Sequence, residues 1–211
     1  MRVELDAVRV GERVHALPST TLRYESTLAT YGFAETEQRP TVLGLLASGR
    51  MRPQHGEVRV DGRVDPAALR RRTALVDAPD VSAPEPQVFV GTVIAEELMF
   101  AGRRADPRAT RRWADHHDLL DDIRRPMATL PPTTRLRMLC ELAVLRRDVE
   151  GLVVVAPDRH GGDPKAWWRL ADEFAGRSYA VLVVGGEAAR LVLGLKPGVP
   201  GAAVAPLKAA G

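Results

Sequence analysis

The first part of the chain alternates between hydrophobic and polar positions. A period of two, rich in Val, Leu, Thr and Tyr, runs over residues 2–10 and 21–31, and Gly11, Pro18 and Gly32 interrupt it. Alternation of this kind predicts β-strands that bury one face. We therefore expect the chain to begin with β-structure.

The remainder alternates between helical spacing and short apolar runs. In chain order, the expected elements are a helix over residues 41–48, a strand and turn in 56–64, a helix over 65–72, a strand over 73–77, a proline-rich loop over 77–87, helices in 92–102, 107–120 and 133–148, a strand over 151–157, a helix over 165–175 and a strand over 179–186. The last two strands are nearly all apolar, as strands buried on both faces are. Strand, helix and strand in this order predict a parallel α/β core.

Composition limits the classes of function. With 211 residues, 45% of them hydrophobic, the chain is long enough for one domain with a large core. A net charge of +3 is too small to require nucleic acid as a partner. The single cysteine, Cys140, excludes a disulfide framework within the chain and fits a reducing cytosol. No apolar run approaches the ~18 residues that span a bilayer, so we expect a soluble protein.

Several segments together carry a resemblance to a known family. TVLGLLASGRMRPQHGEVRVDGR, residues 41–63, closely resembles the helix, turn and strand that follow the Walker A loop in ATP-binding subunits of ABC transporters. Four further segments stand where that family has its Q-loop strand, its helical subdomain, its signature helix with Walker B and D-loop, and its switch-histidine strand: RRRTALVDAP, GTVIAEELMFAG, LPPTTRLRMLCELAVLRRDVEGLVVVAPDRHGGDP and YAVLVVGGEAARL. The resemblance covers residues 2 to about 190 in the family's order.

This resemblance implies a fold. It is an α/β, P-loop NTPase-like core with a mixed or parallel sheet, an N-terminal antiparallel β part and a small helical subdomain. The ATPase-like domain would occupy residues 1–190, with the helical subdomain at about 88–145. Residues 191–211, rich in Gly, Pro and Ala, are expected to form an irregular tail.

The segment in the Walker A position departs from the family pattern. Gln38, Arg39 and Pro40 stand where a glycine, the phosphate-binding lysine and the magnesium-binding hydroxyl belong. Glu35 and Glu37 add negative charge where phosphates would lie. Arg39, helped by Thr41, is either a remaining phosphate contact or a solvated basic residue at a helix start, and the second interpretation is favoured.

The other nucleotide-binding positions depart as well. Val155 and Ala156 replace the Walker B aspartate and glutamate, which would bind magnesium and polarise the attacking water. The remaining replacements are Pro131 and Pro132 in the signature motif, Gly186 at the switch histidine, Ala78 at the Q-loop glutamine and Val10 at the adenine-stacking aromatic. Asp163 and Pro164 match the end of the D-loop, although one extra residue precedes them. The resemblance thus predicts neither catalytic residues nor a bound metal.

Further residue groups could be interpreted as functional sites. The possible sites are a metal site at His116 and His117 between two aspartates, a hydrolytic site at His160 with Asp158 and Asp163, a base-stacking platform at Trp167 and Trp168, and a nucleic-acid surface at the arginines of 70–72 and 111–112. In each case we favour a polar face, core packing or a solvated surface.

Three functional hypotheses follow. The favoured one is a non-catalytic ABC-type subunit, without ATP or Mg²⁺, that docks through the region of residues 78–87 on an integral membrane permease at the cytoplasmic face of the cell membrane. It would pair with itself or with an active ATPase subunit and would not bind nucleic acid. The alternatives are an ATP-hydrolysing subunit that uses Arg39, Glu35 and Asp158, and a soluble interaction module with no membrane role.

Overall fold

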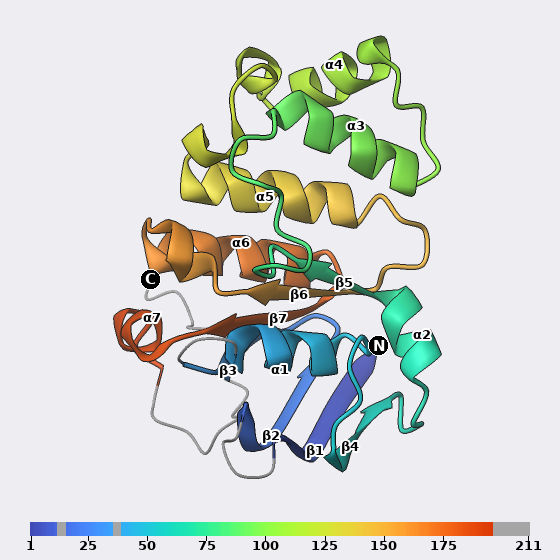
Figure 1. Ribbon diagram of the computed structural model, residues 1–211, viewed down its shortest axis with the longest axis vertical. Helices are drawn as coiled ribbons and strands as arrows, with labels where there is room; N and C mark the ends of the chain where they lie inside the picture. Colours follow the sequence, from blue (N-terminus) through green and yellow to red (C-terminus); the bar gives the residue numbers. More distant parts are fainter. Residues whose placement is uncertain (12–15, 36–38, 196–211) are drawn as a thin grey trace.

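The computed structural model contains two sheets, with helices between and above them (Figure 1). It describes residues 1–11, 16–35 and 39–195. The antiparallel sheet lies at the bottom of Figure 1, the parallel sheet in the middle, and helices are stacked above. Among the described residues, no helix is both long and apolar enough to cross a membrane.

The antiparallel sheet has the strand order β2-β1-β4. It consists of β1 (Arg2–Val10), β2 (Leu17–Glu25) and β4 (His55–Val60). The central strand buries Val3, Leu5 and Val8, and Leu5 pairs with Leu22 on one side and Val58 on the other. The period-two pattern of residues 2–10 is therefore the inward face of a sheet with one buried side.

The second sheet has the order β3-β7-β6-β5, and all three of its strand pairs are parallel. Its strands are β3 (Ala29–Phe33), β5 (Thr73–Val76), β6 (Gly151–Val155) and β7 (Ala180–Gly185). Both central strands, β6 and β7, are buried along their whole length, as their apolar sequences predict.

The helices cover both faces of this parallel sheet. They are α1 (Arg39–Ala47), α2 (Pro66–Arg72), α3 (Val90–Phe100), α4 (Pro107–His116), α5 (Pro132–Ala143), α6 (Pro164–Gly176), α7 (Glu187–Val192) and the short 3-10 helices η1 (Leu120–Asp122), η2 (Met127–Thr129) and η3 (Pro157–His160). Helix α1 lies between the two sheets, whereas α6, α5, α3 and α4 follow one another away from the opposite face (Figure 1).

Two hydrophobic cores result from this layering. Leu152 and Val154 belong to the core beneath α3, α5 and α6. Val153 and Val155, from the opposite face of the same strand, belong to the core that joins α1 to the antiparallel sheet. The predicted α/β class, with an antiparallel N-terminal part and a parallel core, is confirmed.

Several element boundaries differ from the sequence prediction. The single strand expected over 21–31 is two strands, β2 and β3, and β2 already begins at Leu17. Helix α4 ends at His116, and η1 follows it. The tail expected from residue 191 begins inside α7, and its residues 196–211 lie outside the described part of the chain.

Candidate functional site

The parallel strands end together at one edge of the molecule. Glu35 follows β3 closely, Asp77 follows β5, Ala156 follows β6 and Gly186 follows β7. Helix α1 begins at this edge as well, after residues 36–38, which lie outside the described part. In parallel α/β sheets, ligands bind at the carboxyl ends of the strands, so this edge is the candidate site.

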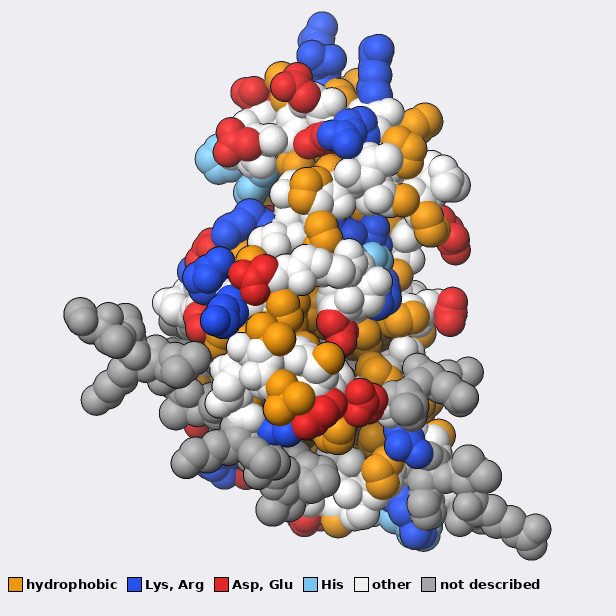
Figure 2. Space-filling model, turned by 90° about the vertical axis from the view of Figure 1, so that its left-hand side faces the viewer, with side chains coloured by type: hydrophobic (Ala, Val, Ile, Leu, Met, Phe, Trp, Pro, Cys, Tyr) orange, Lys and Arg blue, Asp and Glu red, His pale blue; other side chains and the backbone are white. Residues whose placement is uncertain are grey.

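Acidic side chains gather at this edge around Gly186. A Cβ atom placed on Gly186 would lie 3.5 Å from Oε1 of Glu35 and 3.6 Å from Oδ2 of Asp158. The amide of Glu187 donates to the same Oε1 of Glu35 at 3.4 Å, while the Glu187 carboxylate pairs with Arg190. Figure 2 views the side where β7 leads into α7, and red acidic side chains lie together in the lower half of that face.

The two carboxylates around Gly186 set the local electrostatics. Neither Glu35 nor Asp158 forms an ion pair with any residue that the structure describes. Tyr31 donates to the carbonyl of Gly186 at 2.7 Å, and burial followed by the charge of Asp158 raises the pKa of its hydroxyl. An anion at this position would be repelled by ~1 to 4 kcal/mol per carboxylate at about 4 Å, depending on its exposure to solvent.

The two residues predicted as remaining phosphate contacts lie at the start of α1. Arg39 is its first residue and Thr41 its third, and both are half-buried. Neither side chain makes a hydrogen bond or ion pair with another described residue. The neighbouring Glu37 and Gln38 lie outside the described part. Arg39 is thus a half-buried cation at the start of α1, on the edge that also carries Glu35 and Asp158.

The end of β6 carries apolar packing in place of polar groups. Val155 is fully buried in the core beneath α1. A Cβ atom on Gly44 of α1 would lie only 2.6 Å from Cγ2 of Val155, so the helix approaches the strand closely. Ala156 follows in the left-handed region, at φ 46° and ψ 55°. The side chains at this strand end offer no oxygen or nitrogen atom to a ligand.

The strongest polar cluster of the edge is centred on Asp77, which the sequence analysis did not single out. Its carboxylate, 2% exposed, accepts hydrogen bonds from Arg135 at 2.8 Å and from Arg159 at 3.0 Å. His160 Nε2 lies 2.9 Å from the other carboxylate oxygen. Arg159 also donates to the main-chain carbonyl of Asp77 at 2.7 Å. One carboxylate therefore joins β5, α5 and η3.

The environment of Asp77 favours its charged form. Burial acts to raise the pKa of this carboxyl, but hydrogen bonds from His160 and Arg135 and the charges of Arg135 and Arg159 outweigh burial, and the pKa lies below its ordinary value of 3.8. Burial lowers the pKa of Arg159, and the charge of Asp77 partly opposes that effect. The charged groups of the cluster therefore pair with one another, and the arginines already have an acidic partner within the protein.

The segment in the signature position starts a helix. Pro132 is the first residue of α5, where a missing amide is tolerated, and Pro131 precedes it without a side-chain cap. A Cβ atom on Gly162 would lie 3.1 Å from Pro132, so this turn packs against the residues after η3. Two prolines leave the start of this helix with fewer amide donors than other residues would provide.

The remaining candidate groups are occupied by packing or local contacts. His117 packs on Trp113, with ring centroids 4.1 Å apart, and His116 lies beside it. His160 pairs with Asp77, whereas Asp163 caps α6 by accepting from the Lys165 amide. Trp167 and Trp168 are buried in the core. Across the described residues, no three His, Cys, Asp or Glu side chains are grouped so that they could hold a metal ion.

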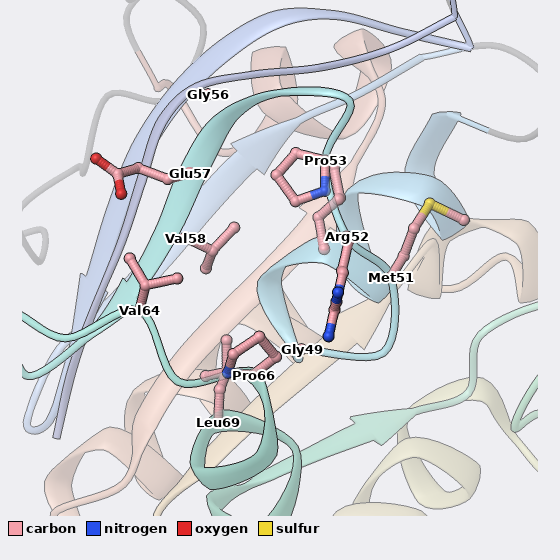
Figure 3. Close-up of a pocket in the computed structure, with 11 residues that line it drawn as sticks. Gly49, Met51, Arg52, Pro53, Gly56, Glu57, Val58, Val64, Pro66 and Leu69 are labelled. Carbon is pink, nitrogen blue, oxygen red and sulfur yellow. The ribbon is translucent and has the colours of Figure 1, made fainter.

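Cavities adjoin the proline-rich loop and the far end of α1. One of about 480 Å³ lies between residues 79–86 and the side chains of Arg135, Arg159 and His160. Another, of about 320 Å³, lies between the end of α1, β4 and α2, and its walls are mainly apolar (Figure 3). Val58, Pro66 and Leu69 line this second cavity, which is remote from the candidate edge.

Comparisons with known proteins place the fold. No protein-family model matches the chain, and no curated protein matches it. An ATP-binding protein of an ABC transporter from Pyrococcus furiosus is 15% identical over 89% of this chain and 92% of its own, with a TM-score of 0.60.

Two further solved structures are similar to the chain over most of its length. An ATP-binding subunit of an ABC transporter is 14% identical over 88% of this chain and 80% of its own, with a TM-score of 0.57. A nucleotide-free ATP-binding cassette from an ABC transporter is 11% identical over 92% and 85%, with a TM-score of 0.63. The chain therefore has the fold of ABC-transporter ATP-binding subunits, as its sequence segments predicted.

Proposed function

We propose that this chain, which has the fold of ABC-transporter ATP-binding subunits, acts as a non-catalytic scaffold or regulatory subunit on an integral membrane permease. It would lie at the cytoplasmic face of the cell membrane and pair with itself or with an active ATPase subunit. The observation that supports this most is the chemistry of the strand-end edge, where a nucleotide would meet carboxylates and apolar side chains.

The edge fits Mg-ATP poorly. A P-loop site needs inward-facing amides, a lysine at the phosphates and a hydroxyl on Mg²⁺, and hydrolysis needs carboxylates after the central strand. Here Arg39 and Pro40 stand at the lysine and hydroxyl positions. Val155, the last residue of β6, and Ala156, which follows it, stand at the carboxylate positions. Loss of one phosphate clamp costs about 10³- to 10⁵-fold in rate, so combined losses predict background hydrolysis.

The scaffold itself is fully built. Both cores are continuous, and the Asp77 cluster fastens β5 to α5 and η3. Maintenance of such a scaffold without the nucleotide chemistry supports a role in binding another protein. In the family that the sequence resembles, the region corresponding to residues 78–87 contacts the permease, and in this chain that loop includes the exposed Val81.

Recovery of a membrane partner tests this proposal. Tagged full-length chain isolated from detergent-solubilised native membranes should carry an integral membrane protein, identified by mass spectrometry. Val81→Asp, at a side chain 51% exposed in the loop, should reduce recovery by about tenfold or more, because a charge would be buried in the contact. Val64→Asp, at a side chain 57% exposed elsewhere, is the matched control and should leave recovery unchanged.

Equal recovery of the membrane protein by both variants would show that the loop of residues 78–87 does not contact the partner. Isolation of soluble proteins alone would contradict the membrane role and favour an interaction module.

A second candidate is a nucleotide-hydrolysing subunit with unusual residues. The convergence of Glu35 and Asp158 over Gly186 favours it, since carboxylate oxygens are the kind of ligand that Mg²⁺ takes. Arg39 would then be the phosphate contact. This candidate requires Mg-ATP to bind with a Kd below about 100 μM, roughly −5.5 kcal/mol, whereas the first candidate requires no such affinity.

A further inference from the structure

An open hollow lies between α3 and α4, the two helices at the top of Figure 1. Its volume is about 610 Å³. Arg111 and Arg124 are the charged residues that line it, and no carboxylate of a described residue does so. Most other lining side chains are apolar, among them Phe89, Ala95, Ala105, Pro107 and Ile123. The hollow thus combines an apolar lining with positive charge alone.

The hollow lies on a different side of α3 from the proposed docking loop. Successive helical residues point about 100° apart, so Ala95 and Met99, four residues later, share one side of α3. Glu97, which lines a small cavity beside residues 81–82, points to another side. Two large apolar side chains are exposed beside the hollow, Met99 at 58% and Phe89 at 53%. This surface is therefore distinct from the one proposed for the permease.

Exposed arginines gather at this end of the molecule. They come from the turn after α3, from α4 and from the segment after η1: Arg103, Arg104, Arg108, Arg111, Arg112 and Arg124. Lys and Arg side chains project from the top of the molecule in Figure 2, the end at which Figure 1 places α4. None of these six arginines forms an ion pair with a residue that the structure describes, whereas the neighbouring Arg125 pairs with Asp122.

Carboxylates balance only part of this charge. Asp106 caps α4 by accepting from two main-chain amides, each at 3.0 Å. The hydrogen bond from the Ala109 amide lowers the pKa of this carboxyl most, and the charges of Arg104 and Arg112 lower it further. The other exposed carboxylates of α3 and α4 are Glu96 and Asp115. The arginines therefore exceed the exposed carboxylates, and the surface is net positive.

The apolar groups on this surface indicate which kind of anion it fits. The arginines come from three segments and spread over one end of the molecule, which matches a broad anionic surface better than one acidic side chain. A nucleic-acid backbone would neutralise them but would leave Met99 and the apolar hollow in water. Basic side chains interspersed with exposed apolar ones are typical of surfaces that bind the headgroup region of a membrane.

We infer that this end of the helical layer binds the anionic phospholipid surface of a membrane directly. Arg111 and Arg124 receive lipid phosphates at the rim of the hollow, while Phe89 and Met99 enter the boundary between headgroups and acyl chains. The inference goes beyond the proposed function, because the contact is with lipid and requires no permease.

Binding of the purified full chain to protein-free vesicles tests the inference. Cosedimentation is measured with phosphatidylcholine vesicles that contain about one-third phosphatidylglycerol, and with phosphatidylcholine alone. The partition coefficient should be at least tenfold larger, on the order of what several arginines contribute, for the anionic vesicles. It should fall as salt is added, because salt screens the attraction between exposed charges.

Arg111→Gln combined with Arg124→Gln should lower the partition coefficient on anionic vesicles by about tenfold or more, since each arginine near such a surface contributes a factor of about five. Arg70→Gln combined with Arg71→Gln is the matched control. These two exposed arginines of α2 also lack an ion pair with any described residue, so the variant loses the same charge away from α4 and should bind like the unmodified chain. Thermal denaturation shows whether both variants are folded.

A fluorescent label tests the apolar part of the contact. Met99→Cys, labelled with a solvent-sensitive dye, should show a blue-shifted emission when anionic vesicles are added. Val64→Cys is the control, because Val64 is equally exposed, at 57%, but lies beside β4 and should show no shift. Cys140 is buried, so the dye reacts with the introduced thiol.

Three results would overturn the inference. They are equal binding to both kinds of vesicle, equal binding by both double variants, and tighter binding of a duplex oligonucleotide that is lost with Arg111 and Arg124. None of them bears on the proposed function, because recovery of an integral membrane protein from native membranes tests that function separately.

Discussion

At the residue scale, Asp77 is the centre of a buried cluster of charged side chains. Its carboxylate ends a buried strand and accepts from Arg135, which is 4% exposed, and from Arg159 on a separate element. Breaking a buried pair by removing one partner is costly because it leaves the other charge without compensation. The same residue also adopts a positive φ of 55°, which the surrounding contacts must hold.

Asp77→Asn should destabilise the fold by ~3 to 5 kcal/mol, because the Arg135 guanidinium would stay buried without a counter-charge. Chemical denaturation measures this change. Glu173→Gln is the matched control, since Glu173 pairs with Arg137 at 2.6 Å on the exposed surface, where a pair contributes ~1 kcal/mol or less. Similar losses for both variants would show that the Asp77 cluster does not stabilise the fold.

The same carboxyl predicts a pH dependence. Its folded-state pKa lies below the ordinary 3.8, so its stabilising contribution is complete above that pH and is lost as pH falls through the lower folded value. The difference in unfolding free energy between the unmodified chain and Asp77→Asn should therefore shrink as pH falls below about 4. A difference that stays constant as the solution is made more acidic than this would contradict the assignment.

The positions that the family resemblance assigns to nucleotide binding could be located in the sequence, but the Asp77 cluster could not. Val155, Ala156 and Gly186 could be named because neighbouring segments fixed their places in the family pattern. Asp77 meets Arg135 and Arg159 across 58 and 82 residues of chain, and no local pattern encodes such a meeting. The only local signal was an aspartate at the end of the buried strand TALV.

At the element scale, the approach of α1 to β6 positions the candidate edge. Gly44 permits this approach, because a Cβ atom there would lie 2.6 Å from Val155 and 3.2 Å from Leu75. Tyr24 fixes the other end of α1 by donating to the carbonyl of Ala47 at 2.7 Å. The helix that follows the expected position of a phosphate-binding loop is thus held against the sheet.

Gly44→Ala should destabilise the fold by ~1 to 3 kcal/mol through overpacking, despite the better helix propensity of alanine. Gly176→Ala, at the last residue of α6, is the control, because a Cβ atom there meets nothing within 4 Å. It should be neutral or stabilising by up to ~1 kcal/mol. Thermal melts of the two variants that coincide would exclude close packing of α1 on the sheet.

Strand boundaries were the least predictable feature at this scale. Residues 26–28 separate β2 from β3 through a turn with Thr27 at φ 74°, yet they contain no Gly or Pro, and 21–31 therefore read as one strand. Pro18 was interpreted as an interruption, but it lies within β2, an edge strand whose outer side needs no amide donor. Buried strands such as β6 and β7 were predicted well because short, continuous apolar runs are typical of strands that are buried on both faces.

At the scale of the whole molecule, two neighbouring features lie at the carboxyl ends of the parallel strands. One is the pair of carboxylates around Gly186, and the other is the proline-rich loop that follows β5 and lines a cavity with Arg135, Arg159 and His160. Two separate hydrophobic cores keep the sheet in place between its helical and antiparallel layers (Figure 1). This arrangement suits a scaffold whose binding surface does not depend on a nucleotide.

Calorimetric titration of the purified full chain with Mg-ATP tests the central claim most directly. An active ABC-transporter ATP-binding subunit, titrated under the same conditions, is the positive control. The account predicts no heat of binding up to millimolar nucleotide, because carboxylates and apolar side chains occupy the edge where phosphates and Mg²⁺ would lie. Saturable binding with a Kd below about 100 μM, lost in Arg39→Ala, would contradict it.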